Sequence, residues 1–550
     1  MWRLYWMTGE FAPSGETLPF GVEAYVQTAS NRYDACGRVI WSRDARGLET
    51  TNEYDTAGRL VRQSWSDGTE EIRTYNVWGQ VLASTDRAGN VTQNEYDAAG
   101  RRVRTTDAKG GVTAWGYDAL GRVVAMTNAA GEVWRYAYDP NGNLTNAVAP
   151  DGTSETRTYT AAGDLASVEK GGITNAFAYD IIGNRTSAAV NGVVVSQSAF
   201  DALGRVVATT NADGVCATNT WNEWSELVET AYTGGASESF AYGDRGMTSA
   251  TDKLGIATSY ERDTLGRVTR TTDGEGHAVD VAYAANGTDQ MESLTDANGN
   301  STRWTYDEWD RQIRKTYADN SAETYAYDAV GRMTNKLDTA GVASTFAYDA
   351  NGNLTGLQRG NECAFAFGYD ALDRRTNVLD AVGTTAWTYD ALGRVTGEIG
   401  PFGTGEVQVA YDANGRMTNV TWGTYEARYA YDELGRITNI AAPEGEYAFT
   451  YHANGIRRAG VTYPNGVTET RTHDELARVT GLAFATRTNE WLSIAYAYDA
   501  GDRRTNEVWS TGREMAYGYD DAHQLTEVEA SRPSDEARYC YDPAGNPMMR

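Results

Sequence analysis

Polar and apolar residues alternate along short stretches of this chain, and glycine-containing turns separate the stretches at steps of ten or eleven residues. In the segment Glu132–Tyr138, for example, Trp134, Tyr136 and Tyr138 alternate with a charged and a small residue. A period of two is typical of a strand with one buried face, and turns this close together do not suit helices. The pattern therefore predicts short β-strands with aromatic and aliphatic side chains on one face.

One motif recurs along almost the whole chain, and its clearest copy is Tyr117-Asp118-Ala119-Leu120-Gly121-Arg122. It returns every 20 to 25 residues, most often every 21, and gives 25 copies between Tyr33 and Tyr541. A fixed period of this length is the signature of a repeat architecture, in which one unit cannot bury its apolar face alone. We interpret each unit as a strand, an Asp-x-x-Gly turn, a strand and a second, looser turn. The irregular copies at Trp221 and Arg262 are interpreted as decayed units.

The Asp-x-x-Gly segment has the chemistry of a type I turn followed by a bulge, with Asp capping its own backbone and Gly in the left-handed conformation. This geometry predicts that Asp118 lies opposite Arg122 on one face, and that Tyr117 lies opposite Val123 on the aromatic face. Exposed Asp–Arg pairs are weak, so we expect them to set the register while the aromatic side chains stabilise the sheet. The residues expected to form this structural turn in three regular copies are Tyr117, Asp118, Gly121, Arg122, Tyr327, Asp328, Gly331, Arg332, Tyr389, Asp390, Gly393 and Arg394.

Twenty-five hairpins amount to about 50 strands, and at ~4.8 Å per strand the flat sheet is ~240 Å wide. Such a ribbon exposes a large aromatic face and two open edges, and the natural twist of strands opposes it. The sheet must therefore coil, and a one-layer wall cannot fill its own interior. We predict an all-β fold of about 25 tandem hairpins in one long antiparallel sheet, coiled into a hollow spiral shell or barrel. Which face lines the interior stays open.

The Tyr-Asp-x-x-Gly-Arg motif, repeated in phase, resembles the YD repeat, also called the RHS repeat. This repeat occurs in bacterial RHS and wall-associated polymorphic toxins, in the B and C components of insecticidal toxin complexes, and in animal teneurins. The resemblance covers residues 19–550, which leaves residues 1–18 as an N-terminal extension. In the toxins it implies a hollow shell that holds a C-terminal toxin polypeptide, released by an aspartyl self-cleaving core. Only Asp542-Pro543-Ala544-Gly545 echoes that core here, so no cleavage residue is assigned.

Charge and hydropathy restrict the partners. The formal net charge is -27 and no segment gathers Lys and Arg into a basic patch, so nucleic acid is not an expected partner. No apolar run reaches the length of a membrane span, and the N-terminal residues lack an apolar stretch long enough for a secretory signal. We expect a secreted or cell-surface protein, exported either by a route that needs no such signal or as a fragment whose leader lies upstream. The unfinished unit at Tyr541 favours a fragment.

The sequence offers no convincing catalytic, cofactor or metal site. The histidines (His277, His452, His473 and His523) and cysteines (Cys36, Cys216, Cys363 and Cys540) fit no known catalytic or metal spacing. The Asp-x-Asn-Gly-Asn segments that begin at Asp139, Asp296 and Asp349 resemble the start of a calcium loop. Their twelfth positions hold Pro150, Asp307 and Gly360 in place of the required Glu. We therefore expect no enzyme and no cofactor.

These patterns favour a non-enzymatic scaffold that encapsulates a toxin or effector polypeptide, either in cis or from a neighbouring chain. The alternative is a cell-surface protein that binds carbohydrate or mediates adhesion, because the 15 Trp and 35 Tyr include candidates for stacking on sugars. Burial of those rings in the aromatic ladder is the favoured explanation for them.

Overall fold

The computed structural model describes residues 30–44, 46–285, 288–361, 363–403, 405–452, 455–486 and 489–548. The predicted N-terminal extension, residues 1–18, lies outside them. Strands account for nearly all regular structure in these ranges, with one 3₁₀ turn, η1 (Pro533–Asp535), and no α-helix. Within the same ranges, no helix has the length and apolarity that crossing a bilayer requires.

Most strands begin after a glycine-containing turn, and every second strand ends at the aromatic ladder position. The first half of the sheet consists of β1 (Ser30–Tyr33), β2 (Val39–Arg43), β3 (Glu49–Tyr54), β4 (Leu60–Trp65), β5 (Glu70–Tyr75), β6 (Val81–Thr85), β7 (Val91–Tyr96), β8 (Arg102–Thr106), β9 (Val112–Tyr117), β10 (Val123–Thr127), β11 (Val133–Tyr138), β12 (Leu144–Val148), β13 (Ser154–Tyr159), β14 (Leu165–Lys170), β15 (Ile173–Tyr179), β16 (Arg185–Val190), β17 (Val193–Phe200), β18 (Val206–Asn211), β19 (Cys216–Trp221), β20 (Leu227–Tyr232), β21 (Ser237–Gly243), β22 (Gly246–Thr251), β23 (Ala257–Arg262), β24 (Val268–Thr272) and β25 (Ala278–Tyr283).

The second half repeats the same alternation. It consists of β26 (Met291–Thr295), β27 (Ser301–Tyr306), β28 (Gln312–Thr316), β29 (Ala322–Tyr327), β30 (Met333–Leu337), β31 (Ala343–Tyr348), β32 (Leu354–Arg359), β33 (Cys363–Tyr369), β34 (Arg375–Leu379), β35 (Thr384–Tyr389), β36 (Val395–Ile399), β37 (Glu406–Tyr411), β38 (Met417–Trp422), β39 (Tyr425–Tyr431), β40 (Ile437–Ala442), β41 (Gly445–Tyr451), β42 (Arg458–Thr462), β43 (Thr468–His473), β44 (Val479–Thr486), β45 (Asn489–Tyr498), β46 (Arg504–Trp509), β47 (Glu514–Tyr519), β48 (Leu525–Ala530) and β49 (Ala537–Arg538), followed by the separate pair β50 (Cys540–Tyr541) and β51 (Pro547–Met548).

Each strand from β1 to β48 pairs antiparallel with the next strand in the sequence, so that 49 strands form one continuous sheet. The prediction of one long antiparallel sheet built from tandem hairpins is confirmed. Because every connection is a short turn, the whole topology follows from local pairing.

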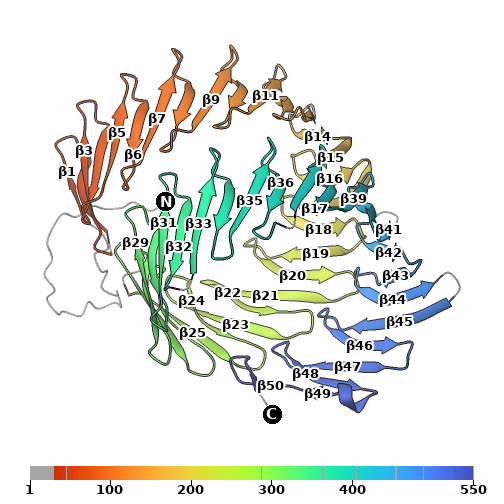
Figure 1. The fold of residues 1–550 in the computed structure, drawn as a ribbon. Helices are drawn as coiled ribbons and strands as arrows, with labels where there is room; N and C mark the ends of the chain where they lie inside the picture. Colours follow the sequence, from red (N-terminus) through yellow and green to blue (C-terminus); the bar gives the residue numbers. More distant parts are fainter. Residues whose placement is uncertain are drawn as a thin grey trace, which may run out of the picture.

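The sheet winds into a spiral. Segments about 244 residues apart meet side by side: Ser66 contacts Glu308, Asn191 contacts Glu433 and Lys253 contacts Asp502. Figure 1 shows the strands from β1 to β11 on one turn of the spiral and those from β29 to β36 on the next. We call β1–β25 the first winding and β26–β49 the second winding.

The wall of the spiral is a single layer. On β11, Trp134, Tyr136 and Tyr138 are half-buried on the aromatic face, whereas Arg135 and Ala137 on the other face are exposed. No large side chain of the described residues is completely buried, because no second sheet or helix packs on the wall. The fold is therefore the hollow spiral shell expected from the sequence.

Candidate functional site

The repeated Asp-x-x-Gly corner is the unit from which the shell is built, and the corner at Asp118 is typical. The Asp118 N–H donates to the Arg122 carbonyl at 3.0 Å, and the Gly121 N–H donates to the Asp118 carbonyl at 3.0 Å. The carboxylate of Asp118 accepts the backbone N–H groups of Leu120 and Arg122, each at 2.9 Å. The bond from the Arg122 backbone, together with its guanidinium, lowers the pKa of Asp118. Tyr117 pairs with Val123, so the predicted register is confirmed.

The other two regular copies have the same geometry. In the corner that follows β29, the Asp328 N–H donates to the Arg332 carbonyl at 2.9 Å, and the Gly331 N–H donates to the Asp328 carbonyl at 3.1 Å. The corner that follows β35 forms both bonds at 3.0 Å, between Asp390 and Arg394 and between Gly393 and Asp390. Tyr327 and Tyr389 are the last residues of β29 and β35, directly before these corners.

Positive φ angles explain the glycine of the motif. Gly121 has φ +83°, a conformation that glycine adopts without cost. In the part of the chain that the structure describes, six corners place another residue there, and each keeps the left-handed conformation at φ between +59° and +69°: Ser225, Asp310, Asp373, Ala477, Asp502 and His523. The turn is therefore retained where its preferred residue is lost.

The corner arginine joins one hairpin to the next. Arg122 Nε donates to its own Asp118 at 2.7 Å, and Nη1 donates to the carbonyl of Asp139, one unit later, at 2.9 Å. Its guanidinium carbon lies 4.8 Å from the ring centroid of Tyr138. The fourteen arginines at this position all stack over the next ladder ring, at 4.4 to 5.7 Å.

Sequence reasoning missed this link, because it assigned the arginine to the face opposite the aromatic ladder. The corner projects beyond the strand ends, so a long side chain there is not restricted to one face of the sheet. The signal was present as a spacing: in the regular units the ladder Tyr follows the arginine by 16 residues, as Tyr138 follows Arg122.

The ladder tyrosine makes a second link between hairpins. The Tyr138 hydroxyl donates to the Val123 carbonyl at 2.8 Å. The backbone register of β10 with β11 begins at Ala125, so the hydroxyl binds a carbonyl beyond that ladder. The interpretation of Trp221 and Arg262 as decayed units is wrong in this respect, because their side chains donate to Val206 and Met247 at 2.9 and 3.0 Å.

The two windings meet along a seam. Second turns of the first winding contact Asp-x-x-Gly corners of the second winding, as where Lys109 Nζ lies 3.2 Å from Asp349 and 2.9 Å from Asp373. The bond to Asp373 raises the pKa of Lys109. Lys253 and Asp502 form a similar ion pair at 2.8 Å. These links are spread along the seam, so neighbouring windings are tied at many points.

Aromatic side chains also pack across the seam. Trp309, in a corner of the second winding, lies edge-on to Trp65 of the first winding with ring centroids 5.6 Å apart. The guanidinium of Arg87 lies 3.4 Å from the centroid of a Trp309 ring. This contact removes both indoles partly from water and contributes apolar stabilisation that the ion pairs lack.

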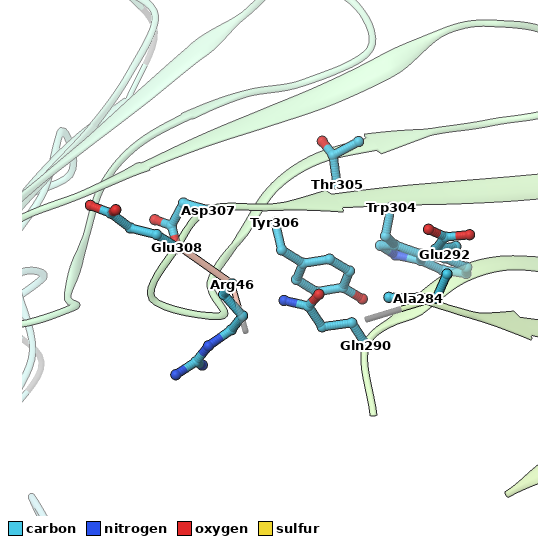
Figure 2. Close-up of a pocket in the computed structure, with 10 residues that line it drawn as sticks. Arg46, Ala284, Gln290, Glu292, Trp304, Thr305, Tyr306, Asp307 and Glu308 are labelled. Atoms are coloured by element: carbon cyan, nitrogen blue, oxygen red, sulfur yellow. The ribbon is translucent and has the colours of Figure 1, made fainter. Parts of the chain in front are cut away.

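Near the start of the seam the wall is hollowed (Figure 2). Arg46 enters from the first winding, and Glu292, Trp304, Tyr306 and Asp307 line the second winding's side. The opening combines one cation, carboxylates and two aromatic rings. None of the described residues that line it is a histidine, cysteine or lysine.

The structure brings two of the four histidines together. His452 Nε2 lies 3.2 Å from His473 Nδ1, with the rings nearly perpendicular. Burial, and then the neighbouring His452, lower the pKa of His473. Arg457 and Asp213 form an ion pair across the seam, 2.9 Å apart, and both charges act on His473.

The other candidate residues, the cysteines and the calcium-loop-like segments, do not form a site in the described structure. Among the described residues no group of His, Cys, Asp and Glu is arranged to hold a metal, and Cys36, Cys216 and Cys540 are free thiols. In the calcium-loop-like segment at Asp139, the side-chain amide of Asn143 donates to the Asp139 carboxylate at 2.9 Å, so this carboxylate closes the turn.

Two family models match the sequence. The model described as RHS Repeat matches residues 75–112 and 117–154, and the model described as Teneurin YD-shell matches residues 239–386 and 378–488. No curated protein sequence matches the chain.

Solved structures with a similar fold include the crystal structures of TcdB2-TccC3-Cdc42 and of TcdB2-TccC3 without its hypervariable C-terminal region. The first has 15% sequence identity over 95% of this chain, and the second has 14% over 94%, each with a TM-score of 0.50. This chain spans about a third of the length of either, 33% and 34%. At this identity the likeness concerns the fold.

Proposed function

Because the chain is a YD/RHS-repeat protein whose sheet forms a scaffold shell, we propose that it encloses a polypeptide cargo. The cargo is a toxin or effector segment, either continuous with the chain or supplied by a neighbouring one. In this role the protein performs no chemistry of its own and acts outside the cell that makes it.

The single-layer wall is the observation that carries this proposal. The stabilising contacts of the wall lie within it: corner arginines and ladder tyrosines join successive hairpins, as Arg122 and Tyr138 do, and seam pairs join successive windings. A wall that is held by its own repeats needs no filling for stability, which leaves the interior available for a guest chain.

The similar structures add support through their composition. Both contain TcdB2 together with TccC3, and one of them lacks a hypervariable C-terminal region. By analogy, the guest of this shell is a polypeptide that varies between relatives, held without a sequence-specific pocket.

Protease protection tests the proposal. The full chain is expressed with a protease-sensitive polypeptide attached to its C-terminus, and digestion of that polypeptide is followed over time. We expect cleavage at least about tenfold slower than for the same polypeptide added free to the shell, because the wall hinders the access of a protease to a polypeptide inside it. Equal rates for the attached and the free polypeptide contradict encapsulation.

Carbohydrate binding is the second candidate. Several tryptophans are exposed, among them Trp78 at 77% and Trp491 at 52% of the maximum, and exposed indoles can stack on sugars. Glycan-array binding that is lost in the Trp78→Ala and Trp491→Ala variants supports this role. Unchanged protection of an attached polypeptide in the same variants distinguishes the two functions.

A further inference from the structure

One rim of the spiral carries a row of exposed apolar corners. After β15, β17 and β19, the third residue of each Asp-x-x-Gly-type corner is Ile182, Leu203 or Trp224, and these side chains are 65%, 73% and 77% exposed. Consecutive corners lie two strands apart, about 10 Å. With the fully exposed Ile181 they form one continuous patch, which we call the corner patch.

The same position is covered in the second winding. Trp309, Leu392, Leu434 and Leu476 occupy it there, and all are half-buried. Trp309 packs on Trp65, and Leu476 lies against the second turn at Gly234, 3.8 Å from the place where a Cβ on that glycine would stand. Within this molecule, then, an apolar corner residue is covered by the second turn of the adjacent winding.

The opposite rim presents uncovered second turns. At the three consecutive second turns after β34, β36 and β38, Val382 and Phe402 in the turns and Trp422 at the end of β38 are 60%, 74% and 51% exposed. Tyr425 is exposed beside Trp422. We call these four residues the turn patch. It is the same kind of edge that covers apolar corners at the internal seam, and it has the same three-turn width as the corner patch.

We infer that the turn patch of one copy of this chain docks on the corner patch of a second copy, so that the contact extends the internal seam between molecules. Contiguous exposed apolar surface of this kind is unusual on a monomer and marks an interaction site. The two patches differ, so the contact is heterologous, and repeated docking stacks copies head to tail along the spiral axis.

Charged substitutions in each patch test the inference by sedimentation velocity and electron microscopy of the full chain. We expect concentration-dependent stacks for the native protein. The double substitution Leu203→Glu with Trp224→Glu, or the single substitution Phe402→Glu, should each weaken self-association by roughly a hundredfold. A mixture of these two variants should restore a dimer and nothing larger, because only one competent patch remains on each partner.

The corner at Ala99 provides the control. It has the same backbone geometry, with the Ala99 N–H donating to Asp97 at 3.0 Å, but no large apolar side chain. Ala99→Glu should leave association unchanged. A native protein that stays monomeric at every concentration, stacks that survive both patch variants, or binding of the corner patch to lipid vesicles in place of a second copy each overturns the inference.

Discussion

The arginine link between hairpins can be tested by replacing Arg122 with Asn. The chain itself supplies the precedent, because Asn143 holds the equivalent position one unit later and keeps its corner closed: its N–H and side-chain amide donate to Asp139 at 2.8 and 2.9 Å. The substitution therefore keeps the hydrogen bonds that close the turn, replaces the exposed Arg122–Asp118 ion pair by an amide hydrogen bond, and removes the reach to the next unit.

The expected cost follows from the two lost contacts. The charged hydrogen bond from Arg122 to the Asp139 carbonyl, at 2.9 Å, is worth about 1.5 kcal/mol. Stacking of the guanidinium on Tyr138, at 4.8 Å, adds about 0.5–1 kcal/mol. A total of about 2 kcal/mol corresponds to roughly thirtyfold more frequent local opening.

Hydrogen exchange measured by mass spectrometry reports this opening directly. Because the repeats interact mainly with their neighbours, the effect should be confined to peptides from β9 to β12 and leave β29–β36 unchanged. Arg135→Asn is the matched control: the same change on the exposed face of β11 should alter exchange by less than about threefold. Equal acceleration in Arg122→Asn and Arg135→Asn refutes the role of the link.

Three further predictions concern the corners and the seam. Ala477→Gly should raise the free energy of unfolding by about 1 kcal/mol in thermal unfolding, because the alanine has the left-handed φ of +69°. Gly121→Ala should lower it by about 1–2 kcal/mol. A destabilising Ala477→Gly together with a stabilising Gly121→Ala contradicts the assignment of a left-handed turn residue at this position. Because the pKa of His473 is lowered, the folded chain binds fewer protons than the unfolded chain near the ordinary histidine pKa. The contribution of His473 to the free energy of unfolding is therefore present above the ordinary histidine pKa and is lost as the pH falls below it. His473→Tyr should remove this step from the pH dependence of stability, and a step that persists excludes His473 as its source. Trp309→Ala should weaken the seam by about 2 kcal/mol and speed exchange in both β4 and β27 while β11 stays protected, and protection of β4 that stays unchanged rules out an anchoring role.

The sequence predicts the parts of this fold that depend on neighbouring residues. The strand alternation, the Asp118 turn and the pairing of Tyr117 with Val123 all follow from local conformational preferences. The length of one winding does not, because it is the sum of small twists over more than twenty strand pairs, and no single residue encodes it. The seam contacts of Lys109 and Trp309 depend on that length, so they appear only in the structure.

The histidine pair illustrates the same limit at a smaller scale. His452 and His473 occupy positions in successive units, and the repeat alone places them on adjacent hairpins. Their contact depends on how the corner at His452 turns its ring toward the next hairpin, which is a side-chain property that the spacing does not specify.

A wall made from one pleated ribbon has a mechanical consequence. Each hairpin is bonded to the hairpins before and after it, and to one neighbour across the seam, so a pull on either terminus loads only the outermost hairpin. The ribbon should peel one hairpin at a time under tension, with a force trace of evenly spaced steps about 21 residues long. Such a container opens from an end and keeps the rest of its wall intact while it does so.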